Sequence, residues 1–115
     1  MEEIILVNQP LSRQQLRELA AQGFGEMVKG VVDVEREVMA LGGELHADSE
    51  AFLLKQGSLQ RDLWGINLYP DMELPEMLEF DSMINIRPSQ NNRSRSVENP
   101  VLQEKIRTIV KRMIL

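Results

Sequence analysis

MVKGVVDVEREVMALGGELHAD, residues 27–48, is the stretch that decides the fold, because its apolar residues alternate as they do in β-strands. The parity of these apolar residues changes between residues 34 and 39. A two-residue turn at Arg36 and Glu37 produces such a change. The stretch therefore predicts a β-hairpin. The side chains on its predicted core face are Val32, Val34, Met39, Leu41 and Leu45.

The opposite face of this hairpin, and of the strands predicted after it, carries polar side chains. Asn and Asp are disfavoured inside strands, because their side chains compete for backbone hydrogen bonds. A face that collects them is therefore either exposed to solvent or part of a binding site. The residues assigned to this polar face are Asp33, Glu35, Glu44, His46, Asn67, Glu79, Asp81, Asn85 and Arg87.

Three helices are predicted outside the hairpin, and the residues expected to cap them are Ser12, Asp48 and Asn99. Gln15 completes a capping box at the first helix. Gly23 and Gly57 are placed to end the first and second helices. Pro100 suits the first position of the third helix, which carries a stripe of apolar residues.

Two further strands are predicted, LWGINLYP over residues 63–70 and LEFDSMINIR over residues 78–87, after a short strand in EEIILVN. Their inward side chains are predicted to be Trp64, Ile66, Leu68, Leu78, Phe80, Ile84 and Ile86. The predicted element order is β-α-β-β-α-β-β-α. We expect an α+β two-layer sandwich, with a largely antiparallel sheet of about five strands and all helices on one face.

The composition predicts one globular domain over residues 1–115. The sequence has no cysteine, which excludes disulfides and thiolate metal sites. Acidic residues stand near the N-terminus where a signal peptide carries positive charge, and no apolar run approaches the roughly 18 residues of a membrane span. We therefore expect a cytoplasmic protein without a membrane partner.

Positive charge is concentrated near the C-terminus of a chain whose net charge is −5. Arg87, Arg93 and Arg95 lie in the segment 87–98, with no acidic residue before Glu98. Arginine recognises phosphate and carboxylate through paired hydrogen bonds, and a helix N-terminus follows this segment.

This arrangement predicts a binding module for an anionic small ligand or an acidic partner segment. The residues predicted to bind the ligand are Arg87, Gln90, Arg93, Arg95, Asn67 and Asn85. The alternative is that the arginines pair with carboxylates of the same chain. Nucleic acid is not an expected partner, because three arginines on an acidic protein give little electrostatic attraction.

A metal-assisted hydrolase that uses Asp33, Glu44, His46 and Asp81 is the second hypothesis. His46 is the only histidine, so general acid or base chemistry near pH 7 would fall to it, and Asp81 is the other candidate catalytic residue. Asp33, Glu44 and His46 are the candidate metal ligands. The short Glu-x-His spacing is common, however, and a solvated sheet face explains the same pattern.

A third hypothesis is a structural protein or a homodimer, formed through an exposed sheet edge or the surface of the last helix. The sequence has no nucleophile elbow and no nucleotide-binding glycine pattern. It identifies no cofactor and leaves open whether the protein is an enzyme.

Several motifs resemble those of a family of small prokaryotic proteins, including cyanobacterial ones, that is catalogued as a domain of unknown function. These motifs are GGELHAD, DLWGINLYP, EFDSMINIRPSQ, and NRSR followed by VE.P. The resemblance implies a small soluble protein with a single domain. It implies no activity and no functional residues.

Overall fold

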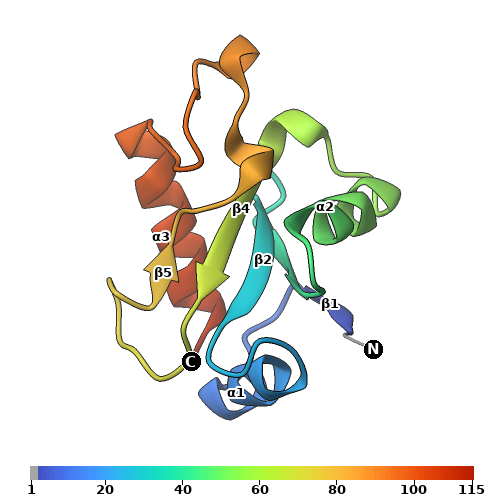
Figure 1. Ribbon diagram of the computed structural model, residues 1–115, viewed down its shortest axis with the longest axis vertical. Coiled ribbons are helices and arrows are strands. Elements are labelled where there is room, and N and C mark those ends of the chain that lie inside the picture. The colour runs from blue at the N-terminus through green and yellow to red at the C-terminus, as the bar shows by residue number, and fades with distance from the viewer. Residues whose placement is uncertain (1–2) are drawn as a thin grey trace.

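The computed structural model describes residues 3–115 and contains an antiparallel five-stranded sheet with three α-helices (Figure 1). In chain order the elements are β1 (Ile4–Val7), α1 (Arg13–Gln22), β2 (Val28–Asp33), β3 (Val38–Gly42), α2 (His46–Lys55), β4 (Leu63–Leu68), β5 (Leu78–Glu79) and α3 (Pro100–Met113). The strands lie side by side in the order β1-β3-β2-β4-β5. The predicted α+β class and the predicted element order are confirmed.

One face of the sheet packs against α1 and α3 and holds most of the core. Met39, Leu41 and Ile66 project from this face and are completely buried. They contact a cluster that includes Leu16 of α1 and Ile106 of α3. The predicted inward parity of β2, β3 and β4 is therefore correct for this face.

The second face is covered in part by α2, so the prediction that all helices lie on one face is wrong. Val31, Ala40 and Leu63 point to this face and form a separate buried cluster with Leu53 of α2. Successive residues of β2 and β3 are apolar where α2 packs, so both faces of the sheet are apolar there. Each of these faces must therefore be buried by a helix. At the other end of the same face, Lys29 remains polar, and α2 does not cover it fully.

The helix caps follow the sequence signals at two of three sites. Ser12 and Asn99 accept hydrogen bonds from the backbone of α1 and α3, and Gln15 closes the predicted capping box. The second helix begins earlier than predicted, at His46 instead of after Asp48. His46 is therefore a helix residue, and its expected position in a strand beside Glu44 is incorrect.

The β2–β3 connection has four residues, 34–37, and is not the predicted two-residue turn. Asp33 Oδ1 accepts the N–H groups of Glu35 and Arg36, each at 2.9 Å, and Glu37 adopts a left-handed conformation. Carboxylate-stabilised turns of this kind have no apolar signature. Leu45, predicted inward, lies beyond the hairpin and is 57% exposed.

The last predicted strand is also shorter than expected, because β5 contains only Leu78 and Glu79. The chain then leaves the sheet and forms a 3-10 turn over Met83–Asn85, where Ser82 Oγ accepts the N–H of Ile84. As a result Ile84 packs beneath α2, and Ile86 is exposed instead of inward.

Candidate functional site

The segment 82–98 is fixed to the sheet by the side chain of Asn85. Its Oδ1 accepts the N–H of Gly65 at 2.8 Å, and its Nδ2 donates to the Gly65 carbonyl at 3.0 Å. The same Nδ2 donates to the carbonyl of Arg95 at 3.0 Å. The buried Asn85 amide therefore pairs with the N–H and the carbonyl of Gly65 in β4, as the backbone of a neighbouring strand would do.

A second buried amide, that of Asn92, organises the inside of the same segment. Its Nδ2 donates to the carbonyls of Asn85, Ser94 and Ser96, and its Oδ1 accepts the N–H of Glu98 at 2.8 Å. These contacts set the path of the chain from the 3-10 turn to the start of α3.

Arg87 is part of this internal scaffold. Its guanidinium group donates to the carbonyls of Gln60, Leu63 and Ile84 and lies 4.2 Å from the centre of the Trp64 ring. Gln90 accepts one further hydrogen bond from it and donates to the carbonyl of Arg61. The structure therefore directs the hydrogen bonds of Arg87, Gln90 and Asn85 to the chain itself.

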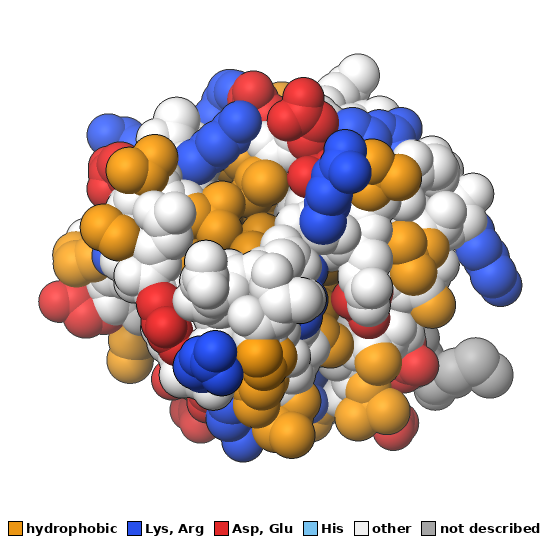
Figure 2. All heavy atoms as spheres, turned by 90° about the horizontal axis from the view of Figure 1, so that it is seen from above, with side chains coloured by type: hydrophobic (Ala, Val, Ile, Leu, Met, Phe, Trp, Pro, Cys, Tyr) orange, Lys and Arg blue, Asp and Glu red, His pale blue; other side chains and the backbone are white. Residues whose placement is uncertain are grey.

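The two remaining arginines of the segment have different surroundings. Arg93 is exposed, and no ion pair joins its side chain to residues 3–115. Arg95 Nε donates to Asp81 Oδ1 at 2.6 Å. In Figure 2, which looks onto the end of the molecule that carries this segment, basic side chains are separated by acidic, polar and apolar ones.

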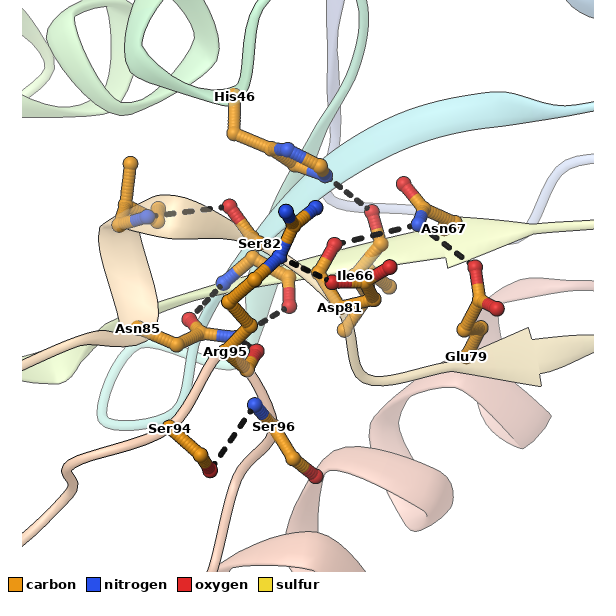
Figure 3. A network of polar contacts seen from close by, with 12 residues as sticks. His46, Ile66, Asn67, Glu79, Asp81, Ser82, Asn85, Ser94, Arg95 and Ser96 are labelled. Atoms are coloured by element: carbon orange, nitrogen blue, oxygen red, sulfur yellow. Dashed lines mark hydrogen bonds and ion pairs between the residues drawn. The ribbon is translucent and has the colours of Figure 1, made fainter.

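A groove of about 460 Å³ lies between the start of α2, the polar end of β4 and the turn after β5. We call it the α2–β4 groove. Its lining residues are Met27, Lys29, Leu45, His46, Ala47, Asn67, Tyr69, Glu79, Asp81, Ser82, Met83, Ile84 and Arg95. The structure thus brings together Asn67, His46, Asp81 and Arg95 from the predicted site residues, as Figure 3 shows.

Hydrogen-bond donors at one end of the groove come from Arg95, which is ion-paired with Asp81, and from the start of α2. Asp81 fixes Arg95 through Nε, and no hydrogen bond within residues 3–115 occupies its terminal nitrogens. Figure 3 shows the guanidinium group extending past Ser82 toward His46. Within residues 3–115, no side chain caps the start of α2, where Leu45 is the N-cap residue, and Leu45, His46 and Ala47 line the groove.

Hydrogen-bond acceptors gather at the other end of the groove. Asn67 lies opposite Glu79 in the β4–β5 pairing, and its Nδ2 donates to Glu79 Oε1 at 2.8 Å and to the Asp81 carbonyl at 3.2 Å. The hydroxyl of Tyr69 donates to the same Glu79 oxygen at 3.0 Å. The predicted placement of Asn67 and Glu79 on one polar face is therefore correct.

His46 is held in one tautomer between these two ends. Its Nε2 lies 2.8 Å from the carbonyl of Ile66, which accepts but cannot donate, so Nε2 carries the proton. Burial lowers the pKa of His46 below 6.5, and the positive charge of Lys29 acts in the same direction, while the hydrogen bond to Ile66, the side chain of Asn67 and the charge of Asp81 oppose the shift. The imidazole is therefore neutral at pH 7, with Nδ1 unprotonated.

This lowered pKa predicts a loss of stability in mild acid. Below pH 6.5 the unfolded chain takes up a proton at His46 before the folded chain does. The free energy of unfolding should fall as the pH drops through 6.5 and level off below the folded pKa. Urea titrations between about pH 8 and about pH 5 test this, with H46Q as the reference. An identical pH dependence in H46Q would contradict the assignment.

The four residues predicted for a metal-assisted hydrolase do not form a metal centre. Asp33 is buried in the hairpin turn, where its Oδ2 accepts a hydrogen bond from Ser58 at 2.6 Å. Glu44 is exposed outside the groove. Within residues 3–115, no three His, Cys, Asp or Glu side chains are placed to share an ion.

Lys29 and Tyr69 belong to the groove but were absent from the predicted site. Lys29 pairs with Asn67 across β2 and β4, so strand register alone brings them together. Aligning the predicted strands β2 and β4 in the sequence could have identified Lys29 as a neighbour of Asn67. Tyr69 lies just beyond β4 and carries no comparable signal.

A family model described as "Protein of unknown function (DUF5674)" matches residues 5–113, and the chain belongs to this family. The expected membership of a family of unknown function is confirmed. No curated protein and no solved structure matches the chain. Among residues 3–115, no helix is both long and apolar enough to cross a membrane.

Proposed function

We propose that this protein is a binding module for a small molecule with an acidic group, and that the α2–β4 groove is its binding site. The observation that carries the proposal is the position of Arg95, whose terminal nitrogens face the groove beside the uncapped start of α2. Charged hydrogen bonds from arginine and the first N–H groups of a helix are both suited to bind anions.

The dimensions and lining of the groove support a small ligand. Its volume, about 460 Å³, is within the usual range of small-molecule sites. Apolar side chains line part of it, and Leu45 and Met83 are 57% and 65% exposed. A ligand with an apolar portion would cover these two side chains and gain affinity from their burial.

The proposal can be tested by NMR titration of the whole chain with sodium phosphate against sodium chloride at equal ionic strength. We expect phosphate to shift the backbone amides of His46 and Ala47 and the Nε–H of Arg95. Replacing Arg95 with Gln should weaken phosphate binding roughly tenfold, because it removes a charge-assisted contact.

R93Q is the matched control, since Arg93 lies in the same segment, is exposed and undergoes the same change of charge. It should bind phosphate almost as well as the unaltered protein. Equal weakening by R93Q and R95Q would indicate a general charge effect. That result, or the absence of phosphate-specific shifts at His46 and Ala47, would overturn the proposed function.

A further inference from the structure

The Asn67 amide has one possible orientation. Its Nδ2 donates to a carboxylate oxygen of Glu79 and to the backbone carbonyl of Asp81. Both partners only accept hydrogen bonds, so the reversed amide would place its oxygen against two other oxygens. Oδ1 is therefore directed away from Glu79 and Asp81, on the side of His46 (Figure 3).

Within residues 3–115, Asn67 Oδ1 has no hydrogen-bond partner of good geometry, although Asn67 lines the groove and is only 5% exposed. The ring of His46 lies near enough to Asn67 for that side chain to raise the pKa of His46, but the aligned hydrogen bond of Nε2–H goes to the carbonyl of Ile66. One N–H shared in this way leaves Oδ1 free to accept a stronger donor. Buried polar atoms are nearly always paired, and an unpaired one reduces stability. A ligand that donates a hydrogen bond would satisfy this oxygen.

The two ends of the groove therefore favour opposite groups. At one end Arg95, which within residues 3–115 keeps its terminal nitrogens free while Asp81 holds its Nε, and the start of α2 provide hydrogen-bond donors. At the other end Asn67 Oδ1 is an available acceptor, and the neighbouring carboxylate of Glu79 balances the charge of Lys29, whose ammonium group donates to the Glu44 carbonyl. A purely anionic ligand would leave this second end unsatisfied.

We propose that the ligand of the α2–β4 groove is a zwitterion of the amino-acid type. Its acidic group binds Arg95 and the start of α2, and its ammonium group donates to Asn67 Oδ1 beside Glu79. An apolar side chain on the ligand covers Leu45 and Met83. This inference rests on the proposed function and specifies the chemistry of its ligand.

L-leucine and isocaproate provide a matched pair of probes, because they share a carbon skeleton and an acidic group and differ in the amine. Isothermal titration calorimetry with the full chain should show L-leucine binding roughly tenfold more tightly, since its amine pairs with a buried oxygen. Isoamylamine, which lacks the acidic group, should bind more weakly than L-leucine.

The possible outcomes separate the two proposals. Equal affinity for L-leucine and isocaproate would overturn the zwitterion inference and leave the proposed function in place. Failure of both to bind would overturn the zwitterion inference, and if phosphate-specific shifts are absent as well, the proposed function is overturned with it. Tighter binding of L-leucine, with a shift of the Asn67 side-chain amide in NMR spectra, is the expected result.

N67A tests the role assigned to Asn67, and its melting temperature reports whether it folds. In a folded N67A, the preference for L-leucine over isocaproate should disappear. A preference that persists would show that another group binds the amine and would overturn the assignment. If N67A does not fold, the affinities of the unaltered protein for the two probes still decide the inference.

Discussion

Replacement of Asn92 by Ala should lower the free energy of unfolding by about 3 kcal/mol and the melting temperature by roughly 15 °C. The substitution removes the donor that pairs with the carbonyls of Asn85, Ser94 and Ser96, and the acceptor for the N–H of Glu98. Asn92 is almost completely buried, so water cannot replace all four contacts. Urea unfolding followed by circular dichroism measures the change.

N92D separates the effect of hydrogen bonding from the effect of side-chain size. The carboxylate has nearly the same volume and keeps the acceptor for Glu98, but it sets a charged oxygen against carbonyl groups. We expect N92D to be at least as unstable as N92A near pH 7. N8A is the control, because Asn8 is exposed and its side chain makes no hydrogen bond within residues 3–115. Its free energy of unfolding should differ from that of the unaltered protein by no more than about 0.5 kcal/mol. Similar stabilities for N92A and N8A would contradict the role of Asn92.

Asn92 also shows why only part of the fold could be predicted from the sequence. Apolar periodicity and caps identified α1, α3 and the strands β2 to β4, because these elements are stabilised by regular burial on one face. The segment 78–87 has similar alternation, yet only Leu78 and Glu79 pair with β4. Beyond them, the Asn85 side chain replaces backbone pairing, and no local pattern identifies its partner Gly65.

Only the part of the candidate site that lies on regular strands could be predicted, because strand parity determines which face those side chains occupy. Parity correctly placed Asn67 and Glu79 on one face, because successive residues of a strand point to opposite faces and each of the two lies next to an inward leucine, Leu68 and Leu78. Arg95 reaches this face only because Asn85 and Asn92 set the path of a long irregular segment. Its position depends on contacts between distant residues, so composition could not distinguish Arg95 from Arg87, which has a structural role.

Replacement of Gly65 by Ala is expected to lower the free energy of unfolding by about 3 kcal/mol. A Cβ at this position would lie 2.5 Å from both Cβ and Oγ of Ser82 and 3.2 Å from Cγ1 of Ile84. The turn that carries Ser82 would have to move away from β4. The two hydrogen bonds between Gly65 and Asn85 would then lengthen, so the steric effect would extend to the buried amide.

A double-mutant cycle with S82G tests whether this close contact is the cause. S82G alone should cost about 1 kcal/mol, because it removes the hydroxyl that caps the 3-10 turn and adds backbone freedom. In the double variant the added methyl group has space, so the combined loss should be about 1 to 2 kcal/mol smaller than the sum of the two single losses. Additive losses would contradict the contact. Glycine at position 65 is therefore explained by the close approach of the turn to β4, and the same approach forms one wall of the α2–β4 groove.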